Sequence, residues 1–169
     1  MTLRLTCLLL LTAIAFTGCS RTATLQLRGT APLNLNEAGE STPVDVRIYQ
    51  LKSDAHFRKA AFEKLWTKDK ETLGDDLLAG PKTVSVLPGG AGEPTAKVEL
   101  GELATGTNFI GIMAMYAKAD AKDNRTLVVA VDDAEKYIIE FTSYAVALRE
   151  LKPAASKSAE DKPAETKTK

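Results

Sequence analysis

Apolar and polar residues alternate with a period of two in several parts of this chain, and no other feature restricts its fold as strongly. In residues 44–51, Val44, Val46 and Ile48 fall on one side of an extended segment, whereas polar or aromatic residues fall on the other. Residues 23–28 alternate in the same way. Such segments are typical of half-buried strands, with one face on the core and the other toward solvent.

Further strands are expected later in the chain. Residues 109–116 are almost continuously apolar, which is typical of a central strand covered on both faces. The remaining strands are expected at residues 82–87, 95–100, 126–131 and 137–148. About seven short strands with turn residues between them, and no strand–helix alternation, predict a mainly β fold, namely a two-sheet β-sandwich.

The period changes after the second strand. Phe57, Ala61 and Leu65 recur at four-residue spacing, which predicts a helix over residues 54–68. Ser53 precedes it and can act as its cap. The sandwich is therefore expected to carry a helical insertion.

Two more aromatic residues, Phe62 and Trp66, widen the apolar face of this predicted helix. We expect the face to dock on the sheet, and a binding role for Trp66 is the alternative. A shorter helical segment is expected at residues 70–78, because Gly80-Pro81 can stop a helix.

A long connection, residues 29–43, joins the first two strands, although two residues are enough for a hairpin. It is rich in Asn, Glu, Gly, Ser, Thr and Pro, with Leu33 and Leu35 as apolar residues inside it. Loops of this length are often functional. The connection is therefore a candidate binding segment.

Residues 1–18 have the pattern of a secretion signal. Arg4 supplies the positive start, and the apolar run at residues 5–16 is too short for a permanent membrane helix. The sequence Phe16-Thr17-Gly18-Cys19 resembles a bacterial lipobox, in which the cysteine is lipidated and the signal is then removed. The alternatives are an ordinary signal peptide that happens to contain a cysteine, and a buried N-terminal helix.

Lipidation of Cys19 would anchor the protein stably, because more than one acyl chain would enter the membrane. Ser20 stands where Asp is the common signal for retention at the inner membrane, so the expected location is the periplasmic face of the outer membrane. The anchored domain would comprise residues 19–151. Residues 152–169 contain no Leu, Ile, Val or aromatic residue and are expected to be a disordered polar tail, either without function or in weak contact with peptidoglycan or a partner.

Composition excludes several classes of protein. The 22 basic residues are matched by 22 acidic ones, so the basic excess of a nucleic-acid-binding protein is missing. One histidine and two cysteines, Cys7 and Cys19, are too few for a multi-ligand zinc site or a disulfide framework. No metal or cofactor is expected.

Patterns typical of catalysis are weak. A surface or capping role is expected for His56, the single histidine. The carboxylate pairs Asp75-Asp76 and Asp132-Asp133 are neighbours in sequence, so their side chains diverge on a helix or a strand. Residues 88–94 are glycine-rich but lack the Gly-Lys-Ser/Thr of a phosphate-binding loop. We therefore expect no enzyme activity.

The lipobox, the first strand and residues 33–52 together resemble the TssJ family (SciN/VasD-like) of outer-membrane lipoproteins of bacterial type VI secretion systems. Residues 46–52, Val-Arg-Ile-Tyr-Gln-Leu-Lys, are the most specific part, whereas Leu35 stands where the family often has Pro. The resemblance continues with Phe57, Phe62 and Leu65, with Leu-Gly-Asp-Asp-Leu-Leu at 73–78, and with Pro88-Gly89.

The resemblance implies a transthyretin-like sandwich with a helical insertion after the second strand, and a structural role in anchoring the secretion machine. The implied partner is the periplasmic C-terminal domain of the inner-membrane subunit TssM, and the implied contact is the loop at residues 31–42. In that loop, Leu33 and Leu35 would be apolar contacts unless either folds back under its own sheet. The partner-binding residues expected are Leu33, Asn34, Leu35, Asn36, Glu37, Ala38, Gly39 and Glu40.

Two other classes of protein are possible from the residues alone. A lipid-anchored carrier of a small apolar ligand would need an interior cavity, whereas sandwich cores are normally filled by side chains. A periplasmic enzyme acting on the cell wall would need a cleft with converging titratable groups.

Overall fold

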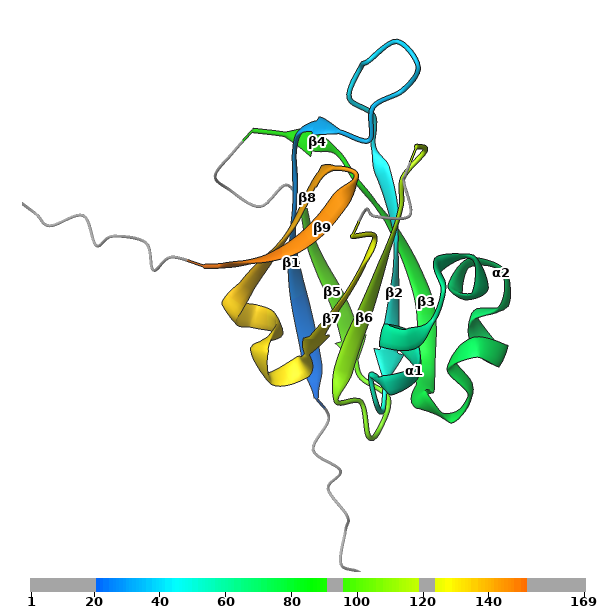
Figure 1. Cartoon of the computed structure of the whole chain (residues 1–169). Coiled ribbons are helices and arrows are strands. Elements are labelled where there is room, and N and C mark those ends of the chain that lie inside the picture. Colours follow the sequence, from blue (N-terminus) through cyan, green and yellow to red (C-terminus); the bar gives the residue numbers. More distant parts are fainter. Residues whose placement is uncertain (1–20, 91–95, 119–123, 152–169) are drawn as a thin grey trace, which may run out of the picture.

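Two β-sheets packed face to face form the body of the molecule (Figure 1). The computed structural model describes residues 21–90, 96–118 and 124–151. One sheet, here called the β1 sheet, has the order β4 (Pro88–Gly89), β1 (Thr22–Leu33), β8 (Tyr137–Ser143) and β9 (Ala145–Glu150), and β5 (Ala96–Glu102) also pairs with β1. The other, the β2 sheet, has the order β3 (Leu77–Val86), β2 (Val44–Leu51), β6 (Phe109–Met115) and β7 (Thr126–Ala130). The predicted two-sheet sandwich is confirmed.

Aliphatic side chains from both sheets fill the space between them. The expected inward residues of β2, which are Val44, Val46 and Ile48, are 0–2% exposed. Leu25 and Leu27 of β1 meet them from the other sheet and are also fully buried. These side chains occupy the region in which a carrier of an apolar ligand would hold its cargo.

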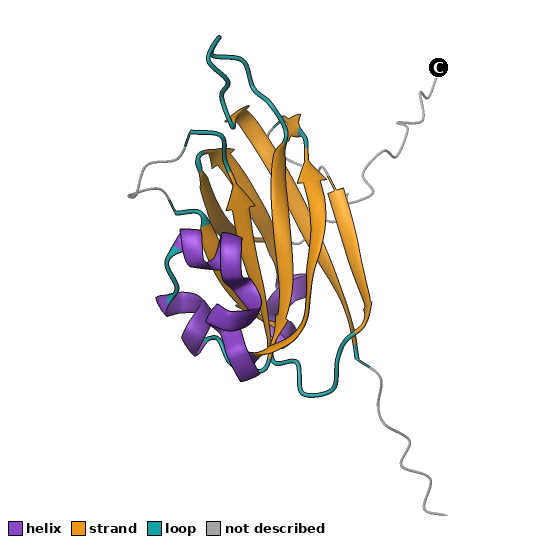
Figure 2. Cartoon of the chain, turned by 90° about the vertical axis from the view of Figure 1, so that its right-hand side faces the viewer, coloured by secondary structure: helices purple, strands orange, loops and turns teal. Residues whose placement is uncertain are grey.

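The helical insertion lies between β2 and β3 and covers the outer face of the β2 sheet (Figure 2). It consists of α1 (Ala55–Lys59), α2 (Phe62–Leu73) and the short 3-10 helix η1 (Gly74–Asp76). A second 3-10 helix, η2 (Val131–Lys136), connects β7 to β8. Among the described residues, none of the helices is both long enough and apolar enough to cross a bilayer.

The insertion differs from the expected single helix over residues 54–68. Ala60 and Ala61 are extended, so the chain breaks there into α1 and α2. The break lets Phe57 on α1 and Leu65 on α2 both reach the sheet, where they are at most 1% exposed. Trp66, which we expected to dock with them, is instead 55% exposed.

Three strand assignments also need correction. β1 continues to Leu33 and so includes residues 29–33, which we expected to belong to the connection. β3 begins at Leu77 and passes through Gly80-Pro81, where we expected a helix to stop. The expected strand at 137–148 is a hairpin of β8 and β9. This split and the short strand β4, which was not expected, give the described residues nine strands instead of about seven.

Candidate functional site

The connection between β1 and β2, residues 34–43, extends beyond the end of the sandwich (Figure 1). The beginning of β1 lies at the opposite end of the molecule, and β1 runs from that end to the loop (Figure 1). At about 3.3 Å per residue, a strand of this length spans roughly 35–40 Å. The beginning of β1 and the loop therefore lie at opposite ends of the domain.

Asn34 holds the base of the loop to the body. Its backbone N–H donates to the carbonyl oxygen of Ser143, the last residue of β8, at 2.8 Å. Its side-chain amide donates to the Thr42 hydroxyl at 3.0 Å and to the Pro43 carbonyl at 2.6 Å. Its side-chain oxygen accepts a 2.7 Å bond from the backbone N–H of Ala117. One residue thus connects both ends of the loop to β6 and to the β8–β9 hairpin.

A second asparagine, Asn36, closes the loop tip. Its side-chain oxygen accepts hydrogen bonds from the backbone N–H groups of Ala38 and Glu40, each at 2.9 Å. Its backbone N–H donates to the Glu40 carbonyl at 3.0 Å, and Gly39 has the positive φ of 79° that the turn requires. Asn side chains commonly form such local turns. The tip is therefore ordered by its own hydrogen bonds before any partner binds.

The predicted loop residues divide into a buried group and an exposed group. Leu33 is fully buried at the end of β1, and Asn34 is 6% exposed with its amide engaged internally. These two side chains do not face outward, and for Leu33 this is the alternative stated above, in which it folds back under its own sheet. Leu35 and Asn36 are half-buried, whereas the exposed residues are Glu37, Ala38, Gly39 and Glu40.

Sequence reasoning missed the residues that support the loop from elsewhere in the chain. Tyr144, in the turn between β8 and β9, donates a hydrogen bond to the Leu35 carbonyl at 3.4 Å. Its ring meets Tyr116 edge to face, with ring centroids 6.0 Å apart. Ser143 and Ala117 act through backbone groups, which no side-chain pattern in the sequence reveals.

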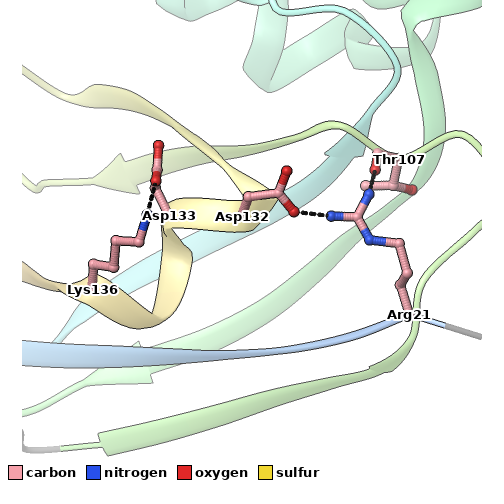
Figure 3. Close-up of polar contacts among 5 residues, drawn as sticks. All are labelled: Arg21, Thr107, Asp132, Asp133 and Lys136. Atoms are coloured by element: carbon pink, nitrogen blue, oxygen red, sulfur yellow. Dashed lines mark hydrogen bonds and ion pairs between the residues drawn. The ribbon is translucent and has the colours of Figure 1, made fainter.

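Asp132 and Asp133 pair with different cations instead of acting as a couple. Asp132 pairs with Arg21 at the beginning of β1, whereas Asp133 lies 2.6 Å from the ammonium of Lys136 (Figure 3). The hydrogen bond to Asp133 raises the pKa of Lys136. Each carboxylate thus has its own cation, and the two side chains point apart.

His56 and Asp76, two other titratable residues that we considered, pair with each other. Asp76 lies 2.6 Å from Nδ1 of His56, an exposed ring on α1. Within the described part of the chain, no three His, Cys, Asp or Glu side chains come together in a way that could hold a metal ion. The ordered loop, with four exposed residues at its tip, is the candidate site with the most structural support.

Comparison with known proteins gives a match to the family model of type VI secretion lipoproteins, which include VasD, EvfM and TssJ, over residues 21–149. This chain belongs to that family. The match extends across both sheets, the helical insertion and the loop.

Solved structures resemble this type VI secretion lipoprotein over most of its length. The T6SS lipoprotein TssJ1 from Pseudomonas aeruginosa is 25% identical, with a TM-score of 0.63 over 80% of this chain and 99% of that one. A chain of a "Type VI membrane complex" is 30% identical, with a TM-score of 0.64 over 77% of this chain and 98% of that one.

A third similar chain is in a structure described as "T6SS protein TssM C-terminal domain (869-1107) from EAEC". It is 27% identical, with a TM-score of 0.60 over 77% of this chain and 98% of that one. No curated protein sequence matches this type VI secretion lipoprotein. The resemblance stated from the sequence is confirmed at the level of family and fold.

Proposed function

We propose that this lipoprotein anchors a type VI secretion membrane complex to the outer membrane by binding the periplasmic C-terminal domain of TssM through the tip of the β1–β2 loop. The observation that carries the proposal is the loop itself, which extends from the sandwich, is closed by Asn36 and exposes Glu37 and Glu40. A binding segment that is ordered in advance loses less conformational entropy when a partner binds.

The similar structures support a partner of this kind. One chain that resembles this one occurs in a structure whose description names the TssM C-terminal domain. Another occurs in a structure described as a type VI membrane complex. The first of these chains is about as long as this sandwich domain, because 77% of the present chain covers 98% of it. It is thus much shorter than the TssM segment 869–1107.

The other part of the proposal concerns the anchor. Cys19, the signal at residues 1–18 and the tail at residues 152–169 lie outside the described residues. We propose that Cys19 carries the acyl chains after the signal is removed. Cys19 precedes Arg21 by two residues, and two residues reach no more than about 7 Å. The end of the sandwich where β1 begins would then face the lipid, and the loop would face the periplasm.

Removal of the loop tip tests the binding proposal. Asn36 and Glu40 already pair at 3.0 Å, so two glycines in place of residues 36–40 can close the chain without disturbing Asn34. We expect affinity for the TssM periplasmic domain, measured by biolayer interferometry, to fall about 100-fold or more, because interface energy is concentrated in a few contacts. Unchanged affinity in a folded variant would reject the loop as the contact.

A charge-reversal pair provides a matched control. Glu37→Lys with Glu40→Lys should weaken binding about 10-fold if the partner presents basic groups to the tip. Glu99→Lys with Glu102→Lys makes the same change in charge on β5, and Glu102 pairs with Thr22 at the other end of the sandwich. The control pair should bind within about two-fold of the wild type. Equal loss in both pairs would indicate a non-specific effect of net charge.

The anchor has its own test. Mass spectrometry of protein purified from membranes should find acyl chains on Cys19, and Cys19→Ser should release the protein from the membrane fraction. Full retention of the Cys19→Ser variant at the membrane would contradict lipidation as the anchor.

A further inference from the structure

A surface hollow of about 500 Å³ lies where α2 approaches the end of β6 and the residue before β7. A volume of this size accommodates a few side chains of a peptide. Its walls include Arg47, Phe62, Trp66, Met115, Ala117 and Arg125. We call it the α2 groove.

Arg125 gives the groove a fixed positive charge. Its guanidinium lies 3.7 Å from the centroid of the Phe62 ring, and its side chain is only 16% exposed. Its ion-pair partner is the carboxylate of Glu63, whose Oε1 lies 4.0 Å from Nη2 of Arg125. The Glu63 side chain is 76% exposed. Such an exposed ion pair contributes little to stability, so another carboxylate can take the place of Glu63 beside Arg125.

Arg47 adds a second positive charge from β2. Its Nη1 donates a 2.9 Å hydrogen bond to the backbone carbonyl of Trp66, which attaches the side chain to α2. Two carboxylates on this side of the β2 sheet have partners of their own: Asp69 accepts a 3.5 Å hydrogen bond from the Tyr49 hydroxyl, and Asp45 accepts one from the Ser85 hydroxyl. Among the described residues that line the α2 groove, two are arginines and none carries a carboxylate. A guanidinium binds a carboxylate through two parallel hydrogen bonds.

Trp66 forms an exposed apolar wall beside these charges. It is 55% exposed, and its ring is tilted by 59° against the neighbouring ring of Phe62, with ring centroids 6.2 Å apart. Within the described residues, Trp66 and Leu87 are the large hydrophobic residues that remain exposed. Tryptophan and arginine are the residue types most enriched among energetically dominant contacts of protein interfaces.

The α2 groove is continuous with the base of the loop. Ala117, one of its lining residues, donates its backbone N–H to the side-chain oxygen of Asn34. The groove therefore lies at the same end of the sandwich as the base of the loop. The loop tip presents the acidic residues Glu37 and Glu40, whereas the groove presents arginines, so the two surfaces select different chemistry on the partner.

We propose that the α2 groove binds an acidic peptide segment of the same partner domain, with a carboxylate between Arg47 and Arg125 and an adjacent apolar side chain against Trp66. This inference rests on the proposed function, because it adds a second contact to the loop. The occupant is a partner segment and not a second copy of this chain, since the groove adjoins the segment proposed to hold that partner.

The test uses protein expressed from the full 169-residue sequence and purified in detergent, with the TssM periplasmic domain as the soluble partner. We expect Trp66→Ala and Arg47→Glu each to raise the Kd about 10-fold or more. The controls on α2 are Lys64→Ala for the truncation and Lys70→Glu for the charge reversal, since both lysines are exposed and neither lines the groove. Both controls should bind within about two-fold of the wild type.

Salt dependence separates a charged occupant from an apolar one. Raising the NaCl concentration should weaken wild-type binding more than binding by Arg47→Glu, because the variant has already lost one screened attraction. Equal salt dependence of the two proteins would contradict a carboxylate in the groove. Circular dichroism at the temperatures used verifies that each variant is folded.

The outcomes distinguish this inference from the proposed function. Wild-type affinity in both groove variants, together with lost affinity after deletion of the loop tip, would overturn the groove and leave the function standing. A change in self-association without a change in TssM binding would assign the groove to a second copy and would also overturn the inference. No binding by the wild-type protein would overturn both.

Discussion

The side-chain oxygen of Asn34 accepts a hydrogen bond from the backbone N–H of Ala117, which lies 83 positions further along the chain, at 2.7 Å. This bond joins the base of the β1–β2 loop to the end of β6. Asn34 also has a positive φ of 45°, a conformation that asparagine adopts more readily than most residues. Its role is therefore to position the loop.

Asn34→Ala should lower the free energy of unfolding by about 3 kcal/mol, because the backbone N–H of Ala117 loses its acceptor, the buried amide bonds to Thr42 and Pro43 are lost, and alanine is strained at this φ. Urea unfolding monitored by circular dichroism measures the change. Glu37→Ala is the control in the same loop, since that side chain is exposed, and it should shift stability by less than about 0.5 kcal/mol. Equal stability of Asn34→Ala and the wild type would contradict this role.

Gly29→Ala should destabilise the junction of β1 and β4. A Cβ at this position would overlap the backbone oxygen of Leu87 and lie 2.8 Å from Cδ2 of Leu33. Backbone atoms cannot move aside without breaking the β1–β4 pairing, so a loss of about 2–3 kcal/mol is expected in thermal or urea unfolding. Gly90→Ala meets no atom within 4 Å and should be close to neutral.

Glu140 should make stability depend on acid pH. The hydrogen bond from Arg149, at 2.6 Å, lowers the pKa of this carboxyl, with further lowering by the charge of Arg28 and the hydroxyl of Thr30. A lowered pKa in the folded state means that the contribution is complete above the unfolded-state pKa and is lost as pH falls through the folded-state value.

The Glu140→Gln variant removes the charge of this side chain and keeps its shape, so it measures the contribution of the charge to stability. It should lower the free energy of unfolding by about 1–2 kcal/mol at pH 7, because two arginines lose a charged acceptor. The difference between the two proteins should shrink as the pH falls below the ordinary glutamate range, where the wild-type carboxyl becomes protonated. A difference that stays constant between pH 7 and pH 2 would show that the charge of Glu140 is not its cause.

Substitution of Phe57 and of Trp66 compares the stability contributed by a buried and by an exposed aromatic residue of the helical insertion. The Phe57 ring lies 5.7 Å from that of Tyr49 and directly against Gly111, so Phe57→Ala should cost about 3–4 kcal/mol. Trp66→Ala should cost about 1 kcal/mol or less, because more than half of the side chain is already in solvent. Comparable costs in differential scanning calorimetry would mean that the insertion does not pack as described.

The alternation in β2 predicts its burial correctly for Val44, Val46 and Ile48, because a strand has a simple geometric period. It places Tyr49 on the opposite face, as observed. The outer face is covered by α1 and α2, however, so Tyr49 is fully buried and burial raises the pKa of its hydroxyl. Periodicity shows which face a residue is on, but not what covers that face.

The elements that were predicted incorrectly depend on contacts between distant residues. No residue between Lys59 and Phe62 is a helix breaker, yet the helix breaks there because Phe57 and Leu65 both pack on the sheet. Gly80 resembles a helix stop in sequence, whereas in the structure it lets β3 approach Ile48 of β2, with a positive φ of 122°. In the candidate site, the loop could be identified by its length, but its attachment through Asn34 could not.

β1 is a single uninterrupted strand from the proposed membrane side of the domain to the base of the loop. If a partner pulls on residues 35–40 while the lipid holds Cys19, the tension passes along one covalent backbone. The strands β4, β5 and β8 pair with β1 at its two edges, so they are not part of that covalent path. The rest of the sandwich can therefore deform under mechanical load without lengthening the covalent path from Thr22 to the base of the loop.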